Sequence, residues 1–245
     1  MAIDSVHVRA ALAKIRGEIA NICERSGRRP DEIDIIAVTK GFGPEAISAA
    51  FAAGLADIGE NYYQEAAAKF AQAAWPSIPF RKHFIGRIQH NKARRIAAIF
   101  DVVQTMQDEK IAIALDAGAA DAGKTLDVLI QANVAGDERQ GVPPEQVGAF
   151  AQTLRRLSHL RLRGIMAIGP NDPARSEDAF NLAAGLYTTL QQSDSRIRML
   201  SIGMSGDMDA AVRAGATMLR LGTALFGSRP AAPALNPANA TKGEG

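Results

Sequence analysis

Short runs of apolar residues alternate with amphipathic segments along most of this chain. Eight runs have the length and composition of buried strands, and they lie at 33–38, 56–61, 83–86, 101–105, 126–134, 160–168, 198–204 and 217–223. The segments between them carry apolar residues at the helical spacing of three and four. A further amphipathic helix is predicted at 5–25, and Gly27 and Pro30 end it.

Eight consecutive strand–helix units favour a closed (β/α)8 TIM barrel, and a doubly wound open sheet is the alternative. The runs read as apolar on both faces, which is typical of parallel strands that are covered on each side. We expect residues 1–228 to form a single barrel with an N-terminal helix, because about 250 residues is usual for this fold. The segment 229–245 is rich in Pro, Ala and Gly and is predicted to be a flexible tail.

Composition and charge narrow the class of protein. The 245 residues carry a net charge of +2 and only 5% aromatic residues, which argues against a nucleic-acid surface. No apolar run approaches the ~18 residues of a membrane helix, and the first residues lack the apolar core of a secretory signal. A single cysteine, Cys23, excludes an intrachain disulfide, and no metal site is expected. We therefore expect a cytoplasmic protein that binds neither nucleic acid nor a membrane.

A reactive amine is predicted at the first strand, because barrels of this type carry their chemistry at the carboxyl ends of the strands. Thr39 and Lys40 follow the first apolar run, and Lys40 is the only lysine that closes such a run. Partial desolvation there lowers the pKa of an amine and favours its attack on carbonyl compounds to form a Schiff base. The alternative is that Lys40 extends to solvent or pairs with Glu60.

An anion site is predicted after the seventh and eighth runs. Ser205 and Gly206 lead into a helical segment, and Gly222 and Thr223 follow the last run. Glycines allow close backbone approach, and a helix start offers free N–H groups. Barrels frequently bind phosphate between these two loops, next to the first strand. A lysine beside such a site suits a phosphorylated aldehyde, although the glycines alone are also explained by tight turns.

Arg220 lies two residues before Gly222, so both residues share one face of the last strand. An inward-facing arginine at this position meets a phosphate, a carboxylate or a ring nitrogen. The alternative is an outward-facing arginine under the final helix.

Several motifs in the same order resemble the pyridoxal phosphate homeostasis protein family, whose barrel is similar to the N-terminal domain of alanine racemase. They are AVTKG (37–41), GENYYQEA (59–66), HFIGRIQHNK (83–92), LIQANVAGDERQGV (129–142), RGIMAI (163–168) and SIGMSGDMDAAVRAGATMLRLGTALFG (201–227). The resemblance covers residues 5–228. It implies a (β/α)8 barrel of fold type III with pyridoxal 5'-phosphate (PLP) as its cofactor.

The resemblance also implies which residues hold the cofactor. Lys40 matches the lysine that forms a Schiff base with PLP, and Arg220 matches the arginine that faces the pyridine nitrogen. The other matching positions line the ring or cradle the phosphate, and they are Asn61, Met166, Ser205, Gly222 and Thr223. Two positions depart from the family pattern, because Gly206 replaces an acid and Gln140 replaces a common lysine. The second departure puts any role of that lysine in cofactor transfer in doubt.

These implied roles favour a cofactor carrier over an enzyme. A cation beside the ring nitrogen disfavours protonation of the ring and makes PLP a poor electron sink. A racemase also needs a second base, which alanine racemase takes from a further domain that this chain is too short to contain. We therefore expect a monomer that holds PLP for intracellular homeostasis and supplies apo PLP-dependent enzymes. The alternatives are a PLP-dependent racemase or related enzyme, and a phosphate-binding isomerase that uses Lys40 without PLP.

Overall fold

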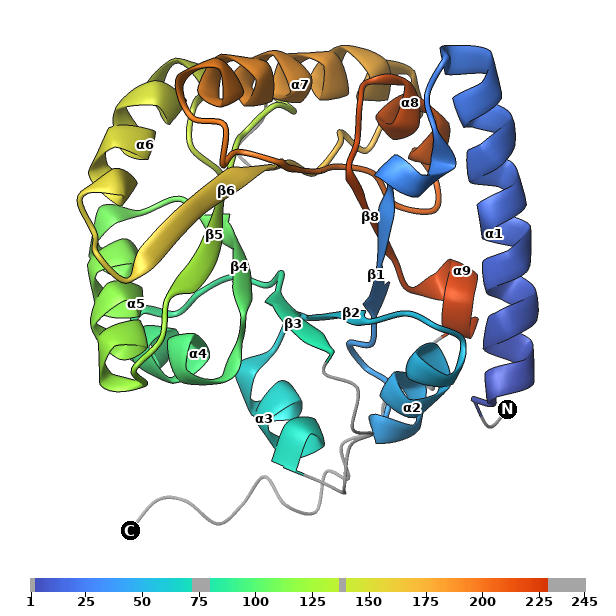
Figure 1. The fold of residues 1–245 in the computed structure, drawn as a ribbon, viewed down its shortest axis with the longest axis horizontal. Coiled ribbons are helices and arrows are strands. Elements are labelled where there is room, and N and C mark those ends of the chain that lie inside the picture. The colour runs from blue at the N-terminus through green and yellow to red at the C-terminus, as the bar shows by residue number, and fades with distance from the viewer. Residues whose placement is uncertain (1–2, 72–79, 137–139, 229–245) are drawn as a thin grey trace, which may run out of the picture.

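The computed structural model describes residues 3–71, 80–136 and 140–228. Within these ranges eight parallel strands close into a barrel in sequence order, and the last strand pairs with the first (Figure 1). The strands are β1 (Asp34–Val38), β2 (Asp57–Glu60), β3 (Arg81–Phe84), β4 (Val102–Met106), β5 (Leu126–Gln131), β6 (Leu160–Met166), β7 (Met199–Ser201) and β8 (Met218–Leu221). The predicted TIM barrel is confirmed and the open-sheet alternative is wrong.

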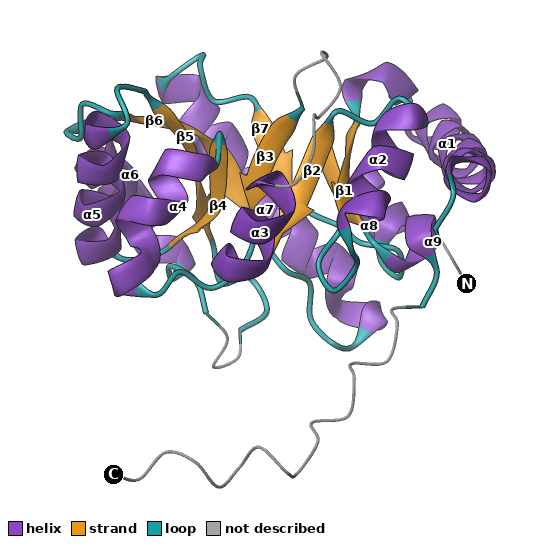
Figure 2. Cartoon of the chain, turned by 90° about the horizontal axis from the view of Figure 1, so that it is seen from below, coloured by secondary structure: helices purple, strands orange, loops and turns teal. Residues whose placement is uncertain are grey.

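Helices surround the barrel, and Figure 2 shows them on both sides of the strands. They are α1 (Ser5–Ser26), α2 (Pro44–Ala52), α3 (Tyr63–Ala71), α4 (Ala93–Ile99), α5 (Glu109–Asp121), α6 (Val147–Arg155), α7 (Ser176–Ser193), α8 (Met208–Arg213) and α9 (Thr223–Phe226). The described ranges also contain four 3-10 turns, at Pro30–Glu32, His90–Lys92, Pro144–Gln146 and Pro173–Arg175. The predicted tail at 229–245 lies outside the described residues. None of the helices in the described ranges is both long and apolar enough to span a membrane.

The first helix forms where the sequence predicts it. Asp4 caps its start, because the Asp4 side chain accepts a hydrogen bond from the N–H of His7 at 2.7 Å. Gly27 ends it in the left-handed conformation, with φ at 65°. The buried stripe packs against α2, α8 and α9 on the outside of the barrel, and consists of Val8, Leu12, Ile15, Ile19 and Ile22.

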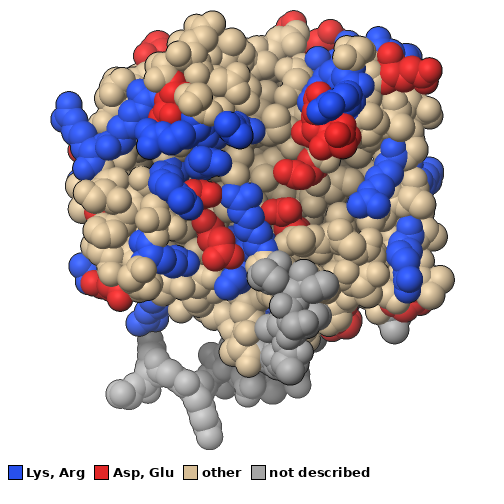
Figure 3. All heavy atoms as spheres, in the orientation of Figure 1, with Lys and Arg blue, Asp and Glu red and all other residues tan. Residues whose placement is uncertain are grey.

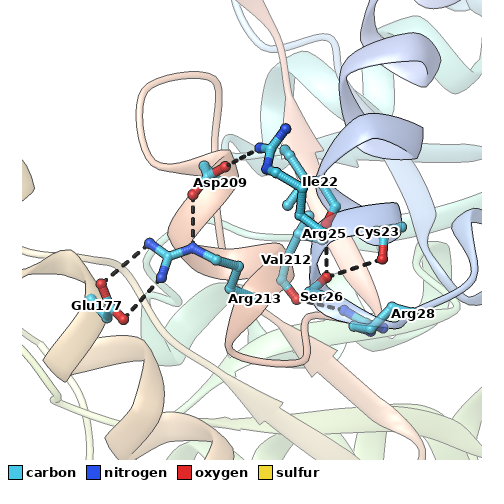
Figure 4. Close-up of polar contacts among 9 residues, drawn as sticks. All are labelled: Ile22, Cys23, Arg25, Ser26, Arg28, Glu177, Asp209, Val212 and Arg213. Carbon is cyan, nitrogen blue, oxygen red and sulfur yellow. Dashed lines mark hydrogen bonds and ion pairs between the residues drawn. The ribbon is translucent and has the colours of Figure 1, made fainter.

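Polar contacts fix the C-terminal end of α1 to α8 (Figure 4). Arg25 pairs with Asp209 at 3.1 Å, and Arg28 donates a hydrogen bond to the carbonyl of Val212 at 2.8 Å. Arg213 of α8 pairs in turn with Asp209 and, at 2.9 Å, with Glu177 of α7. The side chains of the ion pairs are largely exposed, so these pairs orient the helices more than they stabilise them.

Two apolar cores are separated by the wall of strands. The larger core lies between the strands and the helices. The smaller one fills the inside of the barrel and consists of Ile36, Val102, Leu129, Met166, Met199 and Met218. Four polar side chains are buried inside the barrel beside it, namely His83, Gln104, Ser201 and Arg220. The prediction that the strands are apolar on both faces is therefore wrong for part of the interior, where polar groups bond to one another.

The amino ends of the strands form a charged end of the barrel. Basic side chains gather over β6 and the neighbouring ends of α6 and α7 (Figure 3). Arg161 bonds to Asp127 at 2.9 Å, and Arg81 bonds to the same carboxylate at 2.9 Å. A cavity of about 510 Å³ also opens at this end, and the carboxylates of Asp34 and Asp57 line it. These carboxylates make that cavity unsuited to an anion.

Candidate functional site

A second cavity, of about 310 Å³, lies at the carboxyl ends of the strands. Its volume falls in the ~300–1,000 Å³ range of small-molecule sites. It is lined by all seven residues predicted for the site, namely Lys40, Asn61, Met166, Ser205, Arg220, Gly222 and Thr223. The barrel therefore brings together residues from its first, second, sixth, seventh and last strands and the loops after them.

A buried ion-pair cluster holds the backbone on both sides of Lys40. The Nζ of Lys69 donates to the carbonyl of Thr39 at 2.7 Å, to Glu60 at 2.7 Å and to Glu65 at 2.6 Å. Glu65 also accepts from the N–H of Gly41 at 2.6 Å. Lys40 itself is half-buried and lines the cavity. The cluster thus fixes the chain from which the Lys40 side chain extends.

Glu60 is fully buried within this cluster, at the end of β2. Burial raises the pKa of its carboxyl group, while the Lys69 cation and hydrogen bonds from Lys69 and Thr39 oppose that rise. The Thr39 hydroxyl donates to Glu60 at 2.6 Å. Glu60, the alternative partner for Lys40, thus forms an ion pair with Lys69.

Asn61 is held against the loop after β3. A Cβ atom at position 86 would collide with the carbonyl oxygen of Asn61, so only glycine fits there. The side-chain oxygen Oδ1 of Asn61 is buried and has no hydrogen-bond partner among the described residues. A buried acceptor without a partner is costly. Asn61 therefore presents an unsatisfied acceptor in a residue that lines the cavity.

Arg220 is a buried cation that faces the barrel interior. One terminal nitrogen donates to the carbonyl and hydroxyl oxygens of Ser201 at 2.6 and 2.9 Å, and the other donates to the carbonyl of Ala167 at 2.9 Å. Burial lowers the pKa of its guanidinium to about 10, so it stays charged at neutral pH. Within the part of the chain that the structure describes, no carboxylate forms an ion pair with it. Its alternative placement under the last helix is wrong.

The turns after β7 and β8 carry small residues and hydroxyl groups. Gly203 has φ at 91°, and a Cβ atom there would collide with Ala211. Its conformation directs the chain into an exposed turn at Met204–Gly206, where the N–H of Met204 bonds to Asp207 at 2.6 Å. Thr223 begins α9 and is exposed, so its backbone N–H has no partner within that helix. Both turns open on the cavity.

The comparisons with known proteins agree on one family. The model for the alanine racemase N-terminal domain matches residues 11–230. A pyridoxal phosphate homeostasis protein of Vibrio alginolyticus is 42% identical over 211 residues, which cover 84% of this chain and 91% of the relative. The chain belongs to the pyridoxal phosphate homeostasis protein family. The resemblance inferred from its motifs is confirmed.

Two solved structures have the same barrel architecture as this chain. PipY of Synechococcus elongatus, solved with PLP bound, superposes with a TM-score of 0.77 and 32% identity. That alignment covers 90% of this chain and 100% of PipY. An alanine racemase of Clostridium difficile has a TM-score of 0.73 at 16% identity and is covered over 58% of its length, so this likeness concerns the fold alone.

Sequence reasoning missed the groups that support the site. Lys69 pairs with Glu65 at the i,i+4 spacing of its own helix, but its other two partners, Thr39 and Glu60, lie on other segments and have no local signal. Gln104 and Ser201 look like isolated polar residues in apolar runs, although Gln104 alternates with the buried Val102 at the period of a strand. His83 is also fully buried, and nothing in the local sequence indicates that its ring bonds to Gln104 and Asp57. In the described ranges no group of His, Cys, Asp or Glu side chains is arranged to hold a metal ion.

Proposed function

We propose that this protein binds PLP in the cavity at the carboxyl ends of its strands and serves in PLP homeostasis. The observation that carries the proposal is the meeting of Lys40, the buried Arg220 cation and the unpartnered Asn61 oxygen at one cavity. The names of the relatives and the PLP-bound structure of PipY support the same ligand. Because the chain belongs to this family, we propose PLP in particular and not another phosphorylated aldehyde.

The residues present fit the chemical groups of PLP. The phosphate suits the turns with Ser205 and Thr223, because hydroxyl and backbone N–H groups bind anions there. The Asn61 oxygen suits a ring hydroxyl donor. When bound, PLP supplies an aldehyde, which condenses with an amine to give an imine and water. Lys40 is proposed as that amine, and Met166 as an apolar wall for the ring.

Arg220 determines what kind of chemistry the site favours. A guanidinium only donates hydrogen bonds, so a ring nitrogen that faces it must accept and stay unprotonated. An unprotonated pyridine is a weak electron sink. Among the described residues that line the cavity, there is no tyrosine, histidine or carboxylate to act as a second base. We therefore propose a carrier without efficient amino-acid turnover, and steady turnover of alanine or serine would instead support the racemase alternative.

The visible absorbance of the protein with PLP tests the role of Lys40. The wild type is expected to show an imine band that borohydride abolishes, with the reduced cofactor found on Lys40 by peptide mass spectrometry. Lys40→Ala is expected to lose the band. Lys110→Ala, at an exposed position of α5, is the matched control and should keep it. A wild type without any band in the presence of PLP would exclude the proposal and favour the phosphate-binding isomerase.

The expected partners and assembly belong to the same proposal. We propose that the protein acts as a cytoplasmic monomer and supplies PLP to apo PLP-dependent enzymes. A monomer sediments with the chain mass of 26.0 kDa. Transfer is measured as the activity that an apo-enzyme regains when it is mixed with the PLP-loaded protein, against the same amount of free PLP.

A further inference from the structure

A chain of hydrogen bonds crosses the barrel interior from the proposed cofactor site to the opposite end. Arg220 of β8 donates to the hydroxyl of Ser201 of β7 at 2.9 Å, and that hydroxyl donates to Gln104 of β4 at 2.7 Å. The amide nitrogen of Gln104 lies 2.9 Å from Nδ1 of His83 of β3. The Nε2 of His83 lies 2.7 Å from Asp57 of β2. Five strands thus contribute one link each.

The two ends of this chain determine its direction. The guanidinium of Arg220 only donates, so the Ser201 oxygen accepts from it and gives its own proton to Oε1 of Gln104. The amide NH2 of Gln104 then faces His83, so Nδ1 of the ring must accept. The ring proton therefore lies on Nε2 and is donated to the Asp57 carboxylate, which only accepts. A proton on Nδ1 would leave two donors facing each other.

We propose that Asp57, His83 and Gln104 are positioning residues that hold Arg220 in place for the ring of PLP. This inference rests on the proposed function. Asp57 selects one tautomer of His83, which orients the Gln104 amide and through it the Ser201 hydroxyl. The Ser201 oxygen is then free to accept from Arg220. The orientation of the Arg220 side chain, which is proposed to face the ring, therefore depends on the Asp57 carboxylate at the opposite end of the barrel.

Because these polar groups are buried, a positioning role and a packing role predict different effects of replacing them. His83, Gln104 and Ser201 are fully buried, and Asp57 keeps about a fifth of its side chain exposed, at the cavity that Asp34 and Asp57 line. Apolar residues of similar size would fill the same space without the cost of desolvation. A packing role thus predicts that an apolar replacement is tolerated. A positioning role predicts that only a replacement with an acceptor and a donor in the same order is tolerated.

The tautomer of His83 can be measured without PLP. Long-range proton–nitrogen spectra of protein labelled with 15N-histidine are expected to show Nε2 protonated and Nδ1 unprotonated, with the His83 signals assigned by their loss in His83→Gln. In Gln104→Leu the constraint on Nδ1 is removed, and a population with a proton on Nδ1 is expected. A wild-type ring with its proton on Nδ1, or on both nitrogens, would overturn the proposed direction.

PLP affinity tests the link to the cofactor site. In His83→Gln the new amide can accept from Gln104 and donate to Asp57, so we expect a Kd within about threefold of the wild type. His83→Leu and Gln104→Leu break the chain and should weaken binding about tenfold, with a shifted absorbance maximum. Asp116→Leu removes a part-buried hydrogen bond from the N–H of His159 to a side chain of α5 and is the control, whose Kd should stay at the wild-type value. Circular dichroism shows which variants fold.

The outcomes separate this inference from the proposed function. Equal affinities for His83→Leu, His83→Gln and the wild type would overturn the positioning role while PLP binding stands. Equal weakening in both His83 variants would also overturn it, because the acceptor and donor restored in His83→Gln would then have no effect on binding. A wild type that does not bind PLP would overturn the proposed function and the positioning role with it, even if the expected tautomer of His83 is observed.

Discussion

Lys69 and Arg220 are two interior cations that the fold accommodates in different ways. Lys69 has two carboxylates and a carbonyl around its nitrogen, all within 2.7 Å. Arg220 is held by carbonyl and hydroxyl oxygens, so its charge is not neutralised by an ion pair within the described residues. The first arrangement pairs the cation with carboxylates and stabilises the chain around Lys40. The second keeps a positive potential for a ligand.

Replacement of Lys69 by methionine tests the first arrangement. Lys69→Met leaves the buried Glu60 without its cation, so a loss of about 3–5 kcal/mol in the free energy of unfolding is expected. The raised pKa of Glu60 rises further without Lys69, so the folded state favours the protonated acid. Stability is then lost as pH rises through the pKa of folded Glu60, and the deficit is larger at high pH.

Urea denaturation at pH 5 and pH 8 measures this dependence. Lys110→Met, at an exposed position of α5, is the control and should change the free energy of unfolding by less than about 0.5 kcal/mol. A deficit for Lys69→Met that is the same at both pH values would contradict the assignment to Glu60.

At the scale of elements, the short turns after β7 and β8 decide what the cavity can bind. β7 has only three residues, and the chain turns at Gly203 immediately after it. The turn then exposes Ser205 and Gly206 beside the start of α9. A longer strand would place these residues in the sheet, where their N–H groups would be used in the ladder.

Replacement of Gly203 by alanine tests the role of this turn. The left-handed φ and the collision of a Cβ atom with Ala211 both oppose the change. We expect a loss of about 1–3 kcal/mol in the free energy of unfolding and weaker binding of PLP. Gly185→Ala is the contrasting control, because the exposed Gly185 of α7 has open space around it. That variant should gain about 0.5–1 kcal/mol in urea denaturation and leave binding unchanged. Unchanged stability in Gly203→Ala would refute the argument.

At the scale of the whole molecule, α1 adds an outer layer to one side of the barrel (Figure 1). It packs on α2, α8 and α9, so it joins the first unit of the barrel to the last. The barrel closes where β8 pairs with β1, and we call this place the seam. Helix α1 covers the seam from outside, so both features stabilise the same part of the molecule. The proposed site lies at this seam, because Lys40 follows β1 and Thr223 follows β8.

Truncation of the buried stripe of α1 measures its contribution. Ile15 is 5% exposed, so Ile15→Ala is expected to reduce the free energy of unfolding by about 2–5 kcal/mol. Lys14→Ala lies on the neighbouring exposed face and should stay within about 0.5 kcal/mol. Both values come from urea denaturation of the full chain. Equal effects of the two changes would show that α1 does not support the barrel.

The sequence by itself determined the number and order of the strand–helix units, the helix at Ser5–Ser26 and the residues that meet at the cavity. Periodicity and helix ends are local properties, and parallel strands place their carboxyl ends together wherever the barrel closes. The sequence did not determine the strand boundaries, since the run predicted at 198–204 forms a strand only at Met199–Ser201, where its neighbours pair with it.

Only the tertiary structure decided which polar residues meet inside the barrel. The link from Gln104 to Ser201 joins residues 97 positions apart, and its geometry depends on which side chains of β4 and β7 face inward at the same level. Lys69 likewise reaches Thr39 across 30 positions, from α3 to the end of β1. Such contacts have no periodic signal in the sequence. They form because a buried polar group must find a partner in the folded chain, and closure of the barrel determines which partners are within reach.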